Sequence, residues 1–125
     1  MIRNNPLTRT KHKQARGHFD VMQYRDAKRL YLQICQKDRV DDHAWMMLGL
    51  TQALLNELDE AENSLEKAVE LNPRNFDTLY NLGRVQYGKG RLNQALASYQ
   101  KALSLQPDHI DTLIGLGLSA AGMGQ

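Results

Sequence analysis

The chain has 125 residues, 42% of them hydrophobic and 24% charged, which fits one folded domain and argues against a disordered chain. No apolar run approaches the roughly 18 residues that a membrane-spanning helix needs, and the single cysteine, Cys35, excludes an internal disulfide framework. The basic N-terminus lacks the apolar segment of a secretory signal, so we expect a cytoplasmic protein with no membrane partner.

Residues 1–23 form a basic N-terminal arm. Residues 1–40 carry ten Lys or Arg and three Asp, a net charge of +7, whereas the rest of the chain has a net charge of −5. Such an arm can contact RNA or a membrane, lie against the acidic body of its own chain, or be solvated. We favour the last two interpretations, because single-stranded nucleic-acid sites need aromatic platforms and only Phe19 accompanies the basic side chains. Those side chains are Arg9, Lys11, Lys13 and Arg16.

Residues 24–41 contain one predicted amphipathic helix, YRDAKRLYLQICQ. Its Ala27 and Tyr31 precede Ala61 and Leu65 of the next segment by one constant interval, a period of about 34 residues. This spacing indicates the second helix of a degenerate repeat. The first helix of that repeat would have to come from the arm.

Residues 42–75 predict a pair of antiparallel helices. The first spans about 42–55 and the second about 59–71, where Pro73 ends it because proline lacks the amide donor. Small residues on the facing sides allow the two backbones to approach closely, and larger side chains fill the space beside them. These positions are Trp45, Leu48 and Gly49, then Ala61, Leu65, Ala68 and Leu71.

Residues 76–109 repeat this pair of helices at the same period. Leu82-Gly83 follows Leu48-Gly49 by one period, and Gly90 supplies the turn between the helices. The corresponding positions are Leu79, Leu82, Gly83, Ala95, Tyr99, Ala102, Leu105 and Pro107.

Residues 110–125 predict the first helix of a further, incomplete repeat, with Leu116-Gly117 in register and no charged side chain after Asp111. An exposed apolar face of this kind needs a cover. The chain can be a piece of a longer repeat protein, it can self-associate through this face, or the helix can fray. The predicted self-association residues are Leu113, Leu116, Ala120 and Met123.

The pattern resembles the tetratricopeptide repeat, whose signature is Trp-x2-Leu-Gly-x2-Tyr, then Ala-x3-Phe, then Ala and Pro in a unit of about 34 residues. The usual Tyr is replaced here by Gln52 and Gln86. The resemblance implies an all-α helix-turn-helix solenoid, a right-handed superhelix with about two full repeats and partial flanking repeats. It also implies a protein-interaction scaffold that binds a peptide or helix in a concave groove.

The resemblance places the groove on the first helix of each unit. Its lining is largely apolar, and Asn81 and Arg84 would hold a backbone or carboxylate group of an apolar or amphipathic ligand. The alternative is that the arm itself fills part of this groove. The predicted groove residues are Met46, Met47, Leu50, Tyr80, Asn81, Arg84, Tyr87, Asp111, Ile114 and Leu118.

Two better-known ligand patterns of the family are mostly absent. The carboxylate clamp that grips the C-terminal tails of heat-shock chaperones needs five polar residues, of which only Asn81 is present. The asparagine ladder of O-GlcNAc transferase repeats needs an asparagine at the same position of every unit, and here only Asn81 is present. We therefore expect neither ligand.

The sequence shows no catalytic pattern. There is no phosphate-binding glycine loop, the four histidines lack metal-ligand spacing, and Cys35 has no histidine in register. We expect a protein that is not an enzyme and that needs no cofactor or metal. The alternative is that these repeats recruit a partner or substrate for a larger enzyme, such as a glycosyltransferase or sulfotransferase.

Overall fold

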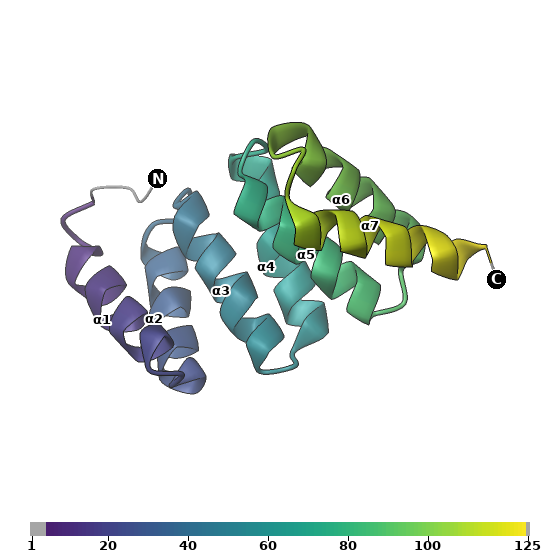
Figure 1. The fold of residues 1–125 in the computed structure, drawn as a ribbon. Helices are drawn as coiled ribbons and strands as arrows, with labels where there is room; N and C mark the ends of the chain where they lie inside the picture. Colours follow the sequence, from purple (N-terminus) through teal and green to yellow (C-terminus); the bar gives the residue numbers. More distant parts are fainter. Residues whose placement is uncertain (1–4, 125) are drawn as a thin grey trace. The chain divides into compact units, whose positions relative to one another are not determined.

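The computed structural model describes residues 5–124, and over that range the chain forms seven α-helices and no strand (Figure 1). The helices fall into two compact units, divided after Leu71. The first unit holds α1 (Arg9–Asp20), α2 (Tyr24–Lys37), α3 (Asp42–Leu54) and α4 (Leu58–Leu71). The second holds α5 (Phe76–Gly88), α6 (Leu92–Leu105) and α7 (Ile110–Met123).

Three helix starts recur at the period of the sequence. Asp41, Asn75 and His109 are the N-cap residues of α3, α5 and α7, and each accepts a hydrogen bond from the backbone amide three residues later. These bonds satisfy amides that have no partner inside the helix. Because successive caps are one repeat period apart, local chemistry sets the same starting point in every unit.

The turns inside the three helix pairs follow the same period. Met22, Asn56 and Gly90 all have left-handed backbone conformations, with φ angles of 64°, 63° and 76°. Glycine and asparagine adopt this region readily, whereas a long side chain such as methionine is strained there. The first helix pair therefore has the same left-handed turn as the other two, although methionine does not favour that conformation.

The core of the first unit is built from small and large residues in alternation. α2 packs between α1 and α3, and α3 packs on α4. A Cβ atom on Gly49 would lie 2.6 Å from Leu65 Cγ, so glycine is needed where α4 meets α3. Tyr31, Ile34, Leu48 and Leu65 are at most 1% exposed.

Arg9–Asp20 of the predicted arm form α1, which is tied to the start of α3 by a buried hydrogen bond, and residues 1–4 of the arm lie outside the described residues. His12 Nε2 lies 2.7 Å from Asp41 Oδ2, while Asp41 Oδ1 accepts from the amide of Ala44. Burial would raise the pKa of Asp41, but the hydrogen bonds from His12 and Ala44 and the nearby histidine charges outweigh burial and lower it. A single carboxylate thus caps α3 and holds α1.

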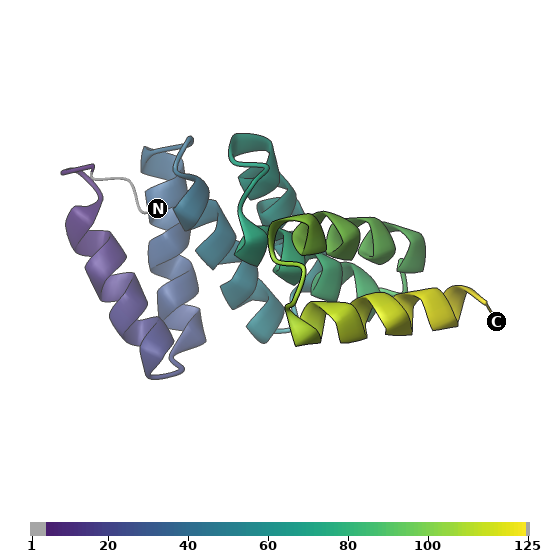
Figure 2. The ribbon, with the colours of Figure 1, turned by 45° about the horizontal axis from the view of Figure 1, so that its top comes forward.

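In the second unit, one aromatic ring lies against two helices. α6 packs on both α5 and α7, and α5 also touches α7 (Figures 1 and 2). A Cβ atom on Gly83 of α5 would lie 2.7 Å from the ring of Tyr99, and one on Gly115 of α7 would lie 2.6 Å from it. Tyr99 is 3% exposed, and its burial beside Tyr80 raises its pKa to about 12.

Each unit also has one buried polar contact between paired helices. Ser64 donates to Gln52 Oε1 at 2.7 Å in the first unit, and Ser98 donates to Gln86 Oε1 at 2.6 Å in the second. These glutamines occupy the place of the tyrosine in the repeat signature. The departure is therefore compensated by a serine twelve residues later in the same unit.

Candidate protein-binding surface

Four predicted groove residues of α5 occupy neighbouring positions along that helix. Arg84 is exposed, Tyr87 is 39% exposed, and Tyr80 and Asn81 are half-buried. Tyr80, Arg84 and Tyr87 are spaced by four and three residues, so they share one face of the helix.

Tyr80 is held by an aromatic cluster. Its ring stacks on Phe76 with centroids 5.9 Å apart, and the ring of His109 lies 5.2 Å from it. The guanidinium carbon of Arg84 lies 5.7 Å from the Tyr80 ring centroid, within the range of a cation–π interaction. Because no carboxylate among the described residues pairs with Arg84, its hydrogen-bond donors remain available to a ligand.

Asn81 is less available than the sequence suggests. Its side-chain nitrogen donates a 2.8 Å hydrogen bond to the backbone oxygen of Asp77, one turn earlier on α5. Its side-chain oxygen is the group that remains for a ligand. Arg84 is therefore the stronger of the two predicted polar contacts.

α7 contributes the second half of this face. Ile114 and Leu118 stand one repeat period after Tyr80 and Arg84, and they are 54% and 51% exposed. Asp111, at the start of the helix, is also exposed. We use the term α5/α7 surface for Tyr80, Arg84, Tyr87, Asp111, Ile114 and Leu118.

The predicted groove residues of the first unit lie mostly in its interior. Met46 and Met47 are 7% and 4% exposed, and Leu50 is half-buried. α1 reaches α3 at its start, where the His12 and His43 rings are 5.9 Å apart. Burial beside His12 lowers the pKa of His43. This leaves Leu50 as the more accessible of the three predicted side chains.

The predicted self-association residues lie on an open face of α7. Leu113 and Met123 are both 46% exposed, Ala120 is exposed, and Leu116 is half-buried. The side of α7 that faces its neighbours is made of small residues instead. These are Thr112, Gly115, Ser119 and Gly122. This small-residue face was not recognised in the sequence, although the period of three and four residues could have shown it.

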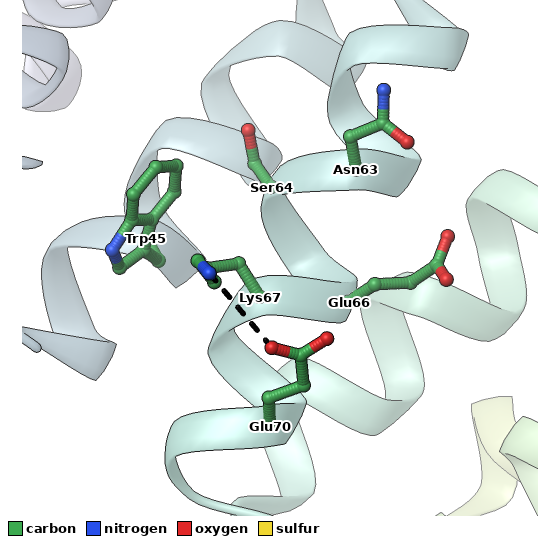
Figure 3. Close-up of a pocket in the computed structure, with 6 residues that line it drawn as sticks. All are labelled: Trp45, Asn63, Ser64, Glu66, Lys67 and Glu70. Atoms are coloured by element: carbon green, nitrogen blue, oxygen red, sulfur yellow. Dashed lines mark ion pairs between the residues drawn. The ribbon is translucent and has the colours of Figure 1, made fainter. Parts of the chain in front are cut away.

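A pocket of about 380 Å³ opens in the first unit, between Trp45 and the outer face of α4 (Figure 3). Lys67 lies 3.9 Å from Glu70 in its wall, and both side chains are well exposed. The indole nitrogen of Trp45 donates to the backbone oxygen of Arg39 and is not free for a ligand. Exposed ion pairs contribute little, so this pocket offers weak recognition compared with the α5/α7 surface.

Metal and membrane sites are the remaining candidates over the part of the chain that the structure describes. There, no group of three or more His, Cys, Asp or Glu side chains could hold a metal ion. Within the same residues, no helix has the length and apolar character needed to cross a membrane. Cys35 is buried, and its burial near Asp41 and Asp38 raises the pKa of its thiol to about 12, so the unreactive thiol form prevails.

Comparison with known families supports what the repeated caps, turns and packing glycines indicate. Three models of the tetratricopeptide repeat match residues 12–63, 49–90 and 76–109, which together run through most of the chain. The chain belongs to the tetratricopeptide repeat family. Its helix pairs form the all-α solenoid fold of that family. No curated protein matches the sequence.

Solved structures of tetratricopeptide proteins are similar to this chain. A crystal structure of MamA matches with a TM-score of 0.90 and 26% identity over 94% of this chain and 68% of MamA. The first repeat domain of Spaghetti (RPAP3), bound to the HSP90 peptide SRMEEVD, matches with a TM-score of 0.91 and 17% identity, over 94% of each chain. An O-GlcNAc transferase from Thermobaculum terrenum matches with a TM-score of 0.83 and 24% identity, and this chain spans 23% of it.

Proposed function

We propose that this tetratricopeptide protein is an interaction scaffold that captures an amphipathic peptide or helix on the α5/α7 surface. The observation that carries the proposal is the position of Arg84, which lies over the Tyr80 ring beside exposed apolar residues. A guanidinium fixed in this way can bind a carboxylate while apolar ligand side chains pack on Ile114 and Leu118.

The charges on this surface define the orientation of the ligand. Arg84 attracts an acidic group, whereas the carboxylate of Asp111 repels one and favours a basic group near the start of α7. The RPAP3 domain holds the peptide SRMEEVD, but only one of the five clamp positions in this chain carries the polar residue of a chaperone clamp. We therefore propose a more apolar ligand with a single acidic contact.

The test uses an array of 15-residue peptides with apolar residues at helical spacing and one Asp or Glu at varied positions. The strongest binder is then titrated by fluorescence anisotropy against the 125-residue chain. We expect Arg84→Gln to weaken binding about tenfold, because a hydrogen bond to a charged group contributes roughly 1.5–3 kcal/mol. Ile114→Ser should weaken the binding of the same peptide, because it removes apolar contact area.

Arg74→Gln is the matched control, because Arg74 is also an exposed arginine of the second unit but lies before α5. It should leave the dissociation constant unchanged. Equal effects of Arg74→Gln and Arg84→Gln would show that only net charge matters, and would contradict the proposed site. An unchanged affinity with both Arg84→Gln and Ile114→Ser would place the ligand elsewhere.

Self-association is a second candidate, supported by the exposed apolar face of α7. Leu113 and Met123 are each 46% exposed, and contiguous apolar surface of this kind commonly mediates association. Light scattering over a concentration series should show mass above 14.2 kDa, and the double variant Leu113→Asn, Met123→Gln should restore the monomer. A dimer that persists in this variant uses another surface.

A role as the recruiting region of a larger enzyme stays an alternative proposal. The similarity to repeats within an O-GlcNAc transferase concerns the fold, since the identity is 24%. Sequencing the natural reading frame beyond Gln125 tests this alternative, because a catalytic domain would follow there.

A further inference from the structure

The side chain of His109 holds the start of α7 through one ring nitrogen. Its Nδ1 atom accepts a hydrogen bond from the backbone amide of Thr112 at 3.2 Å and lies 2.8 Å from the Thr112 hydroxyl. An imidazole nitrogen accepts only when it carries no proton, so the ring that caps α7 has its proton on Nε2. The cap therefore fixes the tautomer of His109 and the place of its ring.

The same ring packs on two aromatic side chains of α5. Its centroid lies 4.7 Å from that of Phe76 and 5.2 Å from that of Tyr80, and it meets Tyr80 edge to face. Both distances lie in the range that aromatic pairs favour. Tyr80 in turn carries the guanidinium of Arg84 over its ring. One side chain thus connects the first turn of α7 to the arginine of the α5/α7 surface.

The first unit contains a link of the same kind between two helices. Asp41, the cap residue of α3, contacts His12 of α1, which lies 29 residues earlier in the chain. His109, the cap residue of α7, contacts Tyr80 of α5 at the same separation. The Asp41 link is buried, whereas His109 and Tyr80 are half-buried and border the exposed side chains of the ligand surface. The link in the second unit can therefore act on a ligand.

We propose that His109 is the positioning residue of the α5/α7 surface. Its cap fixes the ring, the ring restricts Tyr80, and Tyr80 holds Arg84 in the orientation that receives a carboxylate. The ligand then meets ordered side chains, which spares the entropy cost of ordering them on binding. This inference rests on the proposed capture of an amphipathic ligand and assigns a role to a residue outside the surface itself.

The two contacts of His109 can be separated by substitution. Asparagine keeps the cap, as Asn75 does at the start of α5, but it has no ring. Phenylalanine keeps an aromatic ring but has no acceptor for the Thr112 amide. His109→Asn should therefore release Tyr80, and His109→Phe should retain Tyr80 while losing the cap.

The test titrates the acidic peptide selected from the array against both variants of the full 125-residue chain by fluorescence anisotropy. We expect His109→Asn to weaken binding roughly tenfold, because the ligand must then order Tyr80 and Arg84 itself, each at a cost of a factor of about 2–10. His109→Phe should bind within about threefold of the parent chain, although the lost cap lowers its melting temperature by roughly 2–8 °C. An unchanged affinity in His109→Asn would overturn the proposal, as would equally weak binding in the two variants.

Arg84→Gln distinguishes positioning from a general loss of structure. Because His109 acts through Tyr80 on the arginine, His109→Asn should weaken binding in the parent chain but no further in the Arg84→Gln variant. Additive losses would overturn the proposal. His18→Asn is the matched control, since it makes the same change at a half-buried histidine of α1. It should leave the affinity unchanged, and a loss equal to that of His109→Asn would also overturn the proposal.

The ring of Tyr80 tests the inference without any ligand. Its proton signals in the NMR spectrum of the free chain, assigned with Tyr80→Phe, should move in His109→Asn because the ring current of the imidazole is lost. Unchanged Tyr80 signals in this variant would overturn the inference, even if the array yields a binder. An array without a binder would instead contradict the proposed function, and the Tyr80 signals would still decide whether His109 positions this side chain.

Discussion

The ring of Tyr99 lies so close to Gly115 that a single added methyl group would meet it at 2.6 Å. The same ring also lies against Gly83 on the other side, which leaves it little freedom to move. α5, α6 and α7 are thus joined by one aromatic side chain and two glycines. In α7, we therefore expect opposite effects on stability for alanine substitutions at Gly115, which meets this ring, and at Gly117, which does not.

Gly115→Ala should destabilise the protein, although alanine favours helices. Overpacking of a fixed neighbour costs about 1–3 kcal/mol, which outweighs the gain of about 1 kcal/mol in helix propensity. Gly117→Ala should instead stabilise the protein by up to about 1 kcal/mol, because nothing surrounds its Cβ. Urea unfolding of both variants measures the difference, and equal effects would contradict the packing described here.

Ser98→Ala should lower the free energy of unfolding by about 1–3 kcal/mol, because it leaves the buried Gln86 oxygen without its donor. Ser104→Ala, on the exposed side of α6, is the matched control and should change stability little. The double variant Gln86→Leu, Ser98→Ala should lose less free energy of unfolding than the two single variants lose in sum. Additive losses would show that the two side chains do not interact.

Met22→Gly should stabilise the protein by about 1 kcal/mol, because it relieves a left-handed backbone conformation. The Met22 side chain is 73% exposed, so its removal loses little packing. Asn56→Gly should change stability less, since asparagine tolerates this conformation. Thermal unfolding of both variants measures the difference, and a loss of stability in Met22→Gly would mean that the side chain makes a stabilising contact.

Acid should weaken the first unit in two steps. Because the pKa of His43 is lowered from 6.5 in the folded chain, the unfolded chain takes up a proton first and stability falls as the pH drops below about 6.5. The neighbouring groups that face His43 are His12, Asp41 and Asp42. The lowered pKa of Asp41 gives stability that is present above pH 3.8 and is lost as the pH falls further.

His43→Gln should remove the loss of stability that begins near pH 6.5 and keep the loss at lower pH. In urea unfolding at a series of pH values, the slope should decrease by no more than about 1.4 kcal/mol per pH unit, the limit for one proton. Lys13→Gln, an exposed change on α1, controls for net charge. An unaltered slope in His43→Gln would assign the transition to another group.

The repeat spacing was enough to predict the fold. Leu48-Gly49 and Leu82-Gly83 defined the packing faces, and the predicted helices of the first full repeat end within one residue of α3 and α4. The first helix was harder to predict because Gly17 interrupts it and its contact, His12 to Asp41, is polar and long-range. For the binding surface, the sequence predicted which positions belong to it but not which of them are exposed. Met46 and Met47 are buried by packing between helices, and the repeat period carries no information on that packing.

α7 reverses the usual relation between residue size and tolerance to change. Its bulky aliphatic side chains face outward, and its contacts to the rest of the unit run through Thr112, Gly115, Ser119 and Gly122. A combinatorial library at Leu113, Ile114 and Leu118 would therefore sample new partner specificities with little loss of folded protein. The residues that a hydropathy scale marks as core are, in this helix, the freely designable ones.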